Sequence, residues 1–166
     1  LSAVTCAGIA TYDPATETYT FPPEHLLCLT GATEMNLAPL SAACTHLSHF
    51  VAPVEAAFRD GGGVPYDRYR PEFTDVMDGL SRPMMDGILV DKVVPLAADL
   101  PRRLAVGIRV ADIGCGTGHT TNLLARAFPA STFVGYDLAS DALERARNEA
   151  AAWRLPNVSF DVQDVA

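Results

Sequence analysis

Three glycines at alternate positions are the residues of this chain best suited to binding a ligand. Gly114, Gly116 and Gly118 follow an apolar run that ends in Asp112. This pattern predicts a buried parallel strand, a tight turn, and a helix that begins near His119. Glycines in such a turn let a ligand lie directly against main-chain N–H groups. The stretch therefore predicts a site for a nucleotide-like cofactor.

The spacing of these glycines departs from the fingerprint of dinucleotide-binding proteins. That fingerprint, Gly-x-Gly-x-x-Gly, requires its third glycine at the position of His119, whereas this chain has it one residue earlier, at Gly118. Asp112 would also lie beside an anionic pyrophosphate. Its carboxylate better suits a ligand that carries positive charge.

The stretch Asp112-Ile-Gly-Cys-Gly-Thr-Gly118 resembles the first motif, Asp-x-Gly-x-Gly-x-Gly, of the class I S-adenosylmethionine-dependent methyltransferases. The resemblance implies an α/β fold with a Rossmann-like, doubly wound sheet, of which the first three strands fall within the chain. It also implies S-adenosylmethionine as the cofactor. The residues implied to hold its methionine part are Asp112, Gly114, Cys115, Gly116 and Gly118.

Two further β-rich runs lead into acidic residues. Residues 131–136 precede Asp137, which can accept both ribose hydroxyls in this family and in dinucleotide-binding folds alike. Residues 157–160 precede Asp161 and Asp164, and the resemblance maps Asp164 to the adenine amino group. Asp161 is the alternative, because the register of this short strand is open by a residue or two. The implied cofactor site is completed by Leu138, Gln163 and Val165.

Each acid also has a purely structural interpretation. Asp112 can cap the loop, Asp137 can be an acid favoured by a helix N-terminus, and Asp164 can be a surface residue. The same helix N-terminus is expected to lower the thiol pKa of Cys115. His119 is expected to donate or stack near the ligand and has no assigned catalytic role.

Composition limits the classes of protein to which the chain can belong. Of its 166 residues 49% are hydrophobic and 19% charged, which is typical of a domain with a well-formed core. The four cysteines lack Cys-x-x-Cys spacing, which predicts reduced thiols and a cytoplasmic protein. No apolar run reaches the length of a membrane span, and an excess of 20 acidic over 12 basic residues argues against nucleic acid as a partner. His46 and His49 lack further ligands at a matching spacing, so no metal is expected.

The first fifth of the chain has a different pattern. Residues 4–11 and 17–21 predict a β-hairpin with its turn at Asp13-Pro14, and residues 24–30 predict a short helix closed by Gly31. A terminal hairpin of this sort resembles the wing of a winged-helix domain. We therefore expect residues 1–33 to be the remnant of such a domain, with a homodimer formed through this N-terminal region.

Residues 34–104 are expected to form a helical linker or lid before the cofactor domain of residues 105–166. An apolar stripe predicts a packed face with a break at Pro53, and separate helices are expected from Pro71 and from Pro83. The stripe comprises Leu40, Cys44, Leu47, Val51, Val54 and Phe58. Candidates for the substrate pocket are Tyr66, Tyr69, Met84 and Met85.

The sequence predicts methyl transfer from S-adenosylmethionine to an O, N or C nucleophile of a small molecule by in-line displacement. We expect the chain to be an excerpt cut at both ends, because it opens with Leu1 rather than Met and Ala166 follows the third strand directly. No general base can be named. An NAD-dependent oxidoreductase, and a non-catalytic winged-helix regulator that senses the adenosyl ligand, are the alternatives.

Overall fold

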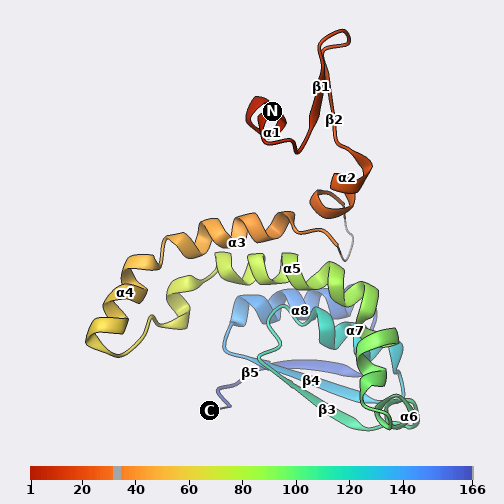
Figure 1. Cartoon of the computed structure of the whole chain (residues 1–166). Coiled ribbons are helices and arrows are strands. Elements are labelled where there is room, and N and C mark those ends of the chain that lie inside the picture. Colours follow the sequence, from red (N-terminus) through yellow and green to blue (C-terminus); the bar gives the residue numbers. More distant parts are fainter. Residues whose placement is uncertain (32–34, 166) are drawn as a thin grey trace.

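The computed structural model describes residues 1–31 and 35–165, and it contains a parallel sheet of three strands at one edge of the molecule (Figure 1). The strands are β3 (Arg109–Ile113), β4 (Thr132–Asp137) and β5 (Val158–Val162), in the order β3-β4-β5. Asp112 pairs with Gly135, and Asp137 pairs with Val162. Since the strands are parallel, their carboxyl ends meet at one edge. The expected α/β sheet is confirmed.

Helices α7 (His119–Ala127) and α8 (Ser140–Ala152) pack against this sheet. Phe133 and Leu143 are at most 1% exposed, and Phe160 is buried beside them. Gly118 immediately precedes α7, and a Cβ there would lie 2.6 Å from Cε1 of Phe160. The missing side chain therefore lets the start of the helix approach the sheet closely.

One long helix, α5 (Glu72–Ile88), lies over α7 and α8 (Figure 1). It continues through Pro83, so the expectation of a new helix at that proline is wrong. Polar contacts to α7 and α8 come from both sides of Pro83, at Arg82 and Asp86, and we attribute the continuity to these tertiary contacts. The π-turn η2 (Leu89–Val93) and the 3-10 turn η3 (Val94–Leu96) then bring Val94 into the core, ahead of α6 (Leu100–Val106).

Helix α3 (Ala38–Ser48) packs on α5, and α4 (Val51–Asp60) follows it. The helix is interrupted by a turn at His49 and Phe50, which lie four and three residues before Pro53. A proline within the first turn of a helix costs no hydrogen bond, so Pro53 belongs to α4. A break was correctly expected, but its position was wrong. After the glycines that end α4 comes the 3-10 turn η1 (Tyr66–Tyr69).

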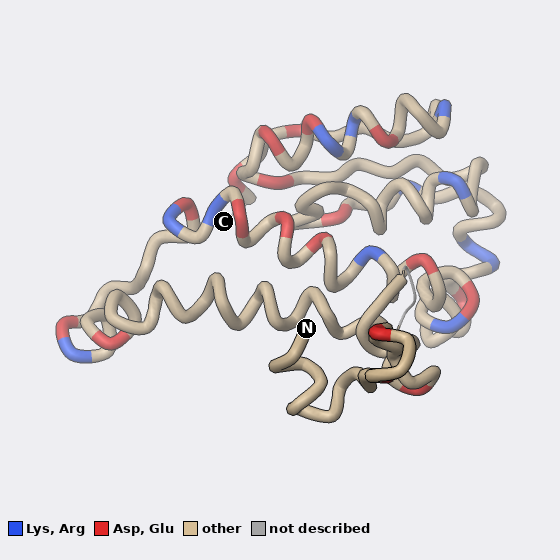
Figure 2. The backbone as a smooth tube through the Cα atoms, turned by 90° about the horizontal axis from the view of Figure 1, so that it is seen from above, with Lys and Arg blue, Asp and Glu red and all other residues tan. Residues whose placement is uncertain are grey.

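The apolar stripe of α3 and α4 is largely exposed, contrary to the expectation of a packed face. Val51 is 64% exposed and Phe58 is 88% exposed, whereas Ala43 is the buried residue of α3. The His46 ring of α3 stacks on Phe73 of α5, while Leu40 and Leu47 of the stripe stay exposed. No charged residue lies on α3, in contrast to α5 and α8 (Figure 2).

The N-terminal hairpin is present but shorter than expected. Its strands are β1 (Thr11–Asp13) and β2 (Thr18–Thr20), and Asp13 closes the turn by accepting from the Ala15 N–H at 2.9 Å. Residues expected to extend the first strand form helix α1 (Ser2–Cys6) instead, because local backbone hydrogen bonds such as Thr5 N–H to Leu1 C=O are made there. Helix α2 (Pro23–Leu29) follows as expected. The expected boundary between residues 33 and 34 lies outside the described residues.

None of the helices within residues 1–31 and 35–165 has both the length and the apolar character required to cross a bilayer.

Candidate functional site

A cavity of about 370 Å³ lies between the glycine loop after β3 and helix α5. One wall is the loop with the ends of β3 and β4, and the other wall comes from α5 and η1. The lining residues on the α5 side are Phe73, Thr74, Met77, Asp78 and Ser81, joined by Tyr66 of η1. The cavity thus has one wall from the strand ends and one from the preceding helical region.

A second cavity of about 380 Å³ adjoins the first. Tyr66, Gly114 and Asp137 line both cavities, so the two are neighbours along the strand ends. The remaining lining residues follow the carboxyl ends of the strands: Ile113, Tyr136, Leu138, Gln163, Asp164 and Val165. Ligands of open α/β sheets bind at this edge of the strands.

Nine of the ten residues assigned from the sequence to the cofactor line these cavities, and Gly118 is the exception. Gly118 lies beneath the site, against Ala146 and Phe160. Asp164 lines the second cavity, while its alternative Asp161 lines neither.

Of the four residues assigned to the substrate pocket, one lines the cavities and three do not. Tyr66 lines both cavities. Tyr69 packs instead on Phe50, with ring centroids 4.2 Å apart, and Met84 and Met85 line neither cavity.

The glycine loop has the backbone geometry of a ligand cradle. Gly114, Gly116 and Gly118 have φ angles of 73°, 55° and 69°, a region that disfavours residues with a Cβ. A Cβ at Gly114 or Gly116 would meet no atom within 4 Å. The protein therefore leaves open space above this backbone for a ligand to approach it closely.

The two strand-end acids hold the loop while facing the cavity. Asp137 accepts from the Gly116 N–H and the Ala139 N–H, each at 2.8 Å, through different carboxylate oxygens. Asp112 accepts from the Thr121 hydroxyl at 2.5 Å. A carboxylate oxygen can accept more than one hydrogen bond, so these contacts leave acceptor capacity for a ligand.

Cys115 lies in the loop and was expected to have a lowered thiol pKa. The structure contradicts this: burial, and then the carboxylates of Asp112 and Asp137, raise the pKa of Cys115 to about 12. The thiol is therefore neutral at physiological pH. Burial disfavours the charged thiolate, and the two neighbouring carboxylates add to this effect, so the helix N-terminus does not dominate.

The first cavity is acidic. Its lining includes Asp78, Asp112 and Asp137, and no Lys or Arg occurs among the lining residues that the structure describes. Burial raises the pKa of Asp78, but hydrogen bonds from Arg82 and Thr117 outweigh this and leave the pKa below its usual 3.8. Asp78 is therefore ionised at neutral pH, but its charge is paired with Arg82. The negative character of the cavity comes mainly from Asp112 and Asp137, and it favours a ligand with positive charge.

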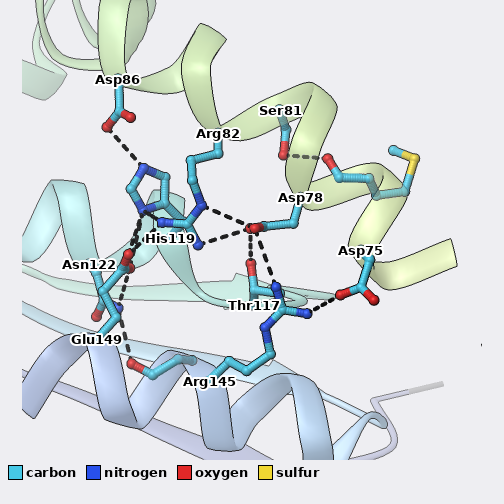
Figure 3. Close-up of polar contacts among 12 residues, drawn as sticks. Asp75, Asp78, Ser81, Arg82, Asp86, Thr117, His119, Asn122, Arg145 and Glu149 are labelled. Atoms are coloured by element: carbon cyan, nitrogen blue, oxygen red, sulfur yellow. Dashed lines mark hydrogen bonds and ion pairs between the residues drawn. The ribbon is translucent and has the colours of Figure 1, made fainter. Parts of the chain in front are cut away.

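Asp78 belongs to a polar cluster that the sequence reasoning missed (Figure 3). We call it the α5 cluster; it comprises Asp78, Arg82 and Asp86 of α5, Thr117 of the loop, His119 and Asn122 of α7, and Glu149 of α8. The four-residue spacing of Asp78, Arg82 and Asp86 puts them on one helix face, and this was the available signal.

His119 is 6% exposed and lies within the α5 cluster. Its ring nitrogens lie 2.9 Å from the Asp86 carboxylate and 3.0 Å from that of Glu149. The ring also lines the first cavity. His119 therefore occupies the position of the third dinucleotide glycine and ties α7 to α5 there.

The part of the chain that holds the glycine loop and the strand ends is similar to known methyltransferases. Residues 104–166 match the family model described as "Methyltransferase domain". A trans-aconitate 2-methyltransferase of Afipia carboxidovorans is 42% identical over 71 residues, which cover 43% of this chain and 25% of that protein. The chain thus spans about a quarter of the length of this curated relative.

Two solved structures are similar over nearly the whole chain. An O-methyltransferase family protein from Burkholderia thailandensis aligns with a TM-score of 0.60 and 20% identity, covering 98% of this chain and 48% of that one. PigF, solved with SAH, aligns with a TM-score of 0.66 and 16% identity, covering 99% and 50%. At these identities the likeness establishes the Rossmann-like fold.

Proposed function

We propose that this chain is the cofactor-binding part of an S-adenosylmethionine-dependent methyltransferase. The observation that carries the proposal is the pair of neighbouring cavities at the strand ends, lined by nine of the ten residues assigned to this cofactor from the sequence. Each cavity lies within the roughly 300–1,000 Å³ typical of small-molecule pockets. The match of residues 104–166 to a methyltransferase domain supports the same conclusion.

The two cavities fit the two ends of the cofactor. Gly114 and Gly116 would receive the methionine part against open backbone, with Asp112 beside its positive charges. Asp137 lines both cavities and would accept from the ribose hydroxyls between them. Asp164 would accept from the adenine amino group, and the backbone of Leu138, Gln163 and Val165 would border the ring.

The charge of the site disfavours NAD. Its pyrophosphate would enter a cavity lined by the carboxylates of Asp112 and Asp137 without a lysine or arginine among the described lining residues. Gly118 provides the close packing of helix on sheet one position before the third glycine of the dinucleotide fingerprint. His119, at the fingerprint position itself, is engaged with two acids.

The reaction requires mainly that the protein align two molecules. Bound S-adenosylmethionine would supply a methyl group on a positively charged sulfur. A nucleophile of the acceptor would bond to the methyl carbon, in line with the carbon–sulfur bond that breaks, and S-adenosylhomocysteine would leave as the neutral thioether. The α5 wall faces the glycine loop across the first cavity, so Phe73, Met77 and Tyr66 are placed to orient an acceptor there and exclude water. Alignment of this kind can supply roughly 7–11 kcal/mol of the barrier.

We propose a small molecule as the acceptor, supported by the name of the trans-aconitate relative. That name does not specify this chain's acceptor, because the match covers 43% of the chain. The acids and apolar side chains of the first cavity favour a neutral or cationic acceptor over a polycarboxylate. Transfer of labelled methyl from S-adenosylmethionine to acceptors of each charge class would test this, with faster transfer to trans-aconitate as the contradicting result.

Calorimetric titration with S-adenosylhomocysteine tests the cofactor assignment. We expect micromolar binding by the unaltered protein, loss of binding in Asp137→Ala, and binding within about twofold of the unaltered protein in Asp161→Ala, whose side chain lines neither cavity. Equal binding by all three proteins would contradict the assignment of Asp137. A protein that binds this ligand yet transfers no methyl group to any acceptor would favour the regulator alternative.

A further inference from the structure

The α5 cluster joins the glycine loop to the opposite wall of the cavity. Thr117 lies between Gly116 and Gly118, and its hydroxyl donates to Oδ1 of Asp78. Asp78 also lines the first cavity, from the α5 side. This contact therefore spans the cavity edge and links the two surfaces between which a ligand would lie.

Arg82 holds Asp78 in that position. Its Nε and Nη2 donate to the two oxygens of Asp78, each at 3.0 Å, while Nη1 donates to Oε1 of Glu149 on α8 at 2.5 Å. The Asp78 side chain is 12% exposed, so its orientation is set by these partners more than by solvent. A two-point contact of this kind fixes geometry as well as charge.

Glu149 is in turn fixed by α7. Asn122, which is fully buried, donates to its Oε2 at 2.9 Å, and the His119 ring lies 3.0 Å from Oε1. One guanidinium thus connects α5, the loop and the two helices that pack on the sheet (Figure 3). Arg82 itself is absent from the lining of either cavity, so it would act on a ligand through other residues.

We propose that Arg82 is a positioning residue of the cofactor site. Through Asp78 and Thr117, it sets the position of the glycine loop relative to the α5 wall. This inference rests on the proposed function, because the ligand it concerns is S-adenosylhomocysteine or the parent cofactor. Removing the contact from Arg82 through Asp78 to Thr117 should weaken ligand binding. The main effect should be on the dissociation rate, because α5 would no longer hold the glycine loop in place.

A double-mutant cycle tests the route. Arg82→Lys keeps the charge but loses the two-point contact, and Thr117→Val removes the hydroxyl with little change of shape. We expect each to weaken binding of S-adenosylhomocysteine about tenfold, through the dissociation rate measured by stopped flow. The double variant should be scarcely weaker than either single one, because both changes break the same path.

Glu72→Gln is the matched control on the same helix. Glu72 is exposed and lines neither cavity, so its loss should change binding by less than about twofold. Near-ultraviolet circular dichroism and urea unfolding would establish that each variant is folded. Thr117 lines the first cavity and could contact the ligand directly, so if Arg82→Lys fails to fold, Glu149→Gln, which removes a partner of Arg82 outside both cavities, replaces it in the cycle.

Each outcome separates this inference from the proposed function. No binding by the unaltered protein would overturn the function itself. Binding that is unchanged in Arg82→Lys or Thr117→Val, or losses that simply multiply in the double variant, would overturn the role of Arg82 alone.

Discussion

At the scale of single residues, Gly116 and Gly118 share a left-handed backbone but differ in surroundings. A Cβ at Gly118 would collide with Ala146 and Phe160, whereas one at Gly116 would enter open space. We expect Gly118→Ala to lower the free energy of unfolding by about 2–4 kcal/mol through overpacking and strain. Gly116→Ala should cost about 1 kcal/mol, from strain alone.

Urea unfolding and ligand titration together check this contrast. Gly116→Ala should lose most binding of S-adenosylhomocysteine, because the added methyl group occupies the space intended for the ligand. Equal losses of stability in the two variants would contradict the assignment of Gly118 to packing and of Gly116 to the ligand cradle.

Cys115 should react with alkylating reagents more slowly than the exposed cysteines Cys6 and Cys44. Its pKa of about 12 leaves almost no thiolate at pH 8, whereas Cys6 and Cys44 are exposed. Brief treatment with iodoacetamide followed by mass spectrometry should find Cys6 and Cys44 modified before Cys115. Preferential labelling of Cys115 would instead indicate the activated thiol expected from the sequence.

At the scale of elements, the α5 cluster makes the packing of α5 on α7 and α8 sensitive to acid. Burial raises the pKa of Glu149, but hydrogen bonds from Asn122 and Arg82 outweigh it, and the pKa falls below its usual 4.5. A carboxylate with a lowered native pKa stabilises the fold fully above its ordinary pKa. The contribution is lost as the pH falls through the native value.

The contribution of Glu149 to the free energy of unfolding should therefore vary little between about pH 7 and pH 5.5. It should decrease once the pH falls below 4.5, the ordinary pKa of a glutamate. Glu149→Gln removes this titration, so its stability should be lower at neutral pH and should change less on acidification. Urea unfolding at a series of pH values would measure both. Parallel pH profiles for the two proteins would show that the Glu149 carboxylate is not what acid disrupts.

At the scale of the whole molecule, the buried and exposed apolar residues should differ sharply in their contribution to stability. Leu104 is 2% exposed in the core, while Phe58 is 88% exposed on α4. We expect Leu104→Ala to cost about 2–5 kcal/mol and Phe58→Ser less than about 0.5 kcal/mol. A large loss in Phe58→Ser would mean that another surface covers α4. The homodimer expected through the N-terminal region stays a prediction.

The sequence was sufficient for features that depend on local pattern. The β-branched runs predicted β3, β4 and β5, and the glycine spacing with Asp137 predicted which residues would meet at the strand ends. Residues next to these strand ends share a location by topology alone, so no long-range contact had to be known.

Features that depend on distant contacts were missed. Arg82 meets Glu149 across 67 residues, and Thr117 meets Asp78 across 39, so neither partner could be assigned from spacing along the chain. Pro83 was expected to start a new helix, and this was wrong. The contacts that keep α5 continuous through Pro83 come from α7 and α8, which the local pattern does not show. The stripe through Val51 and Phe58 predicted burial, but periodicity alone does not specify what packs against a face.

The central claim is that the strand-end site takes the adenosyl cofactor of a methyltransferase and not a dinucleotide. Parallel calorimetric titrations of the same protein with S-adenosylhomocysteine and with NAD test it most directly. The acids of the site and the position of Gly118 predict micromolar binding of S-adenosylhomocysteine and no detectable heat with NAD. Clear binding of NAD without binding of S-adenosylhomocysteine would contradict the claim and assign Asp137 to an oxidoreductase site.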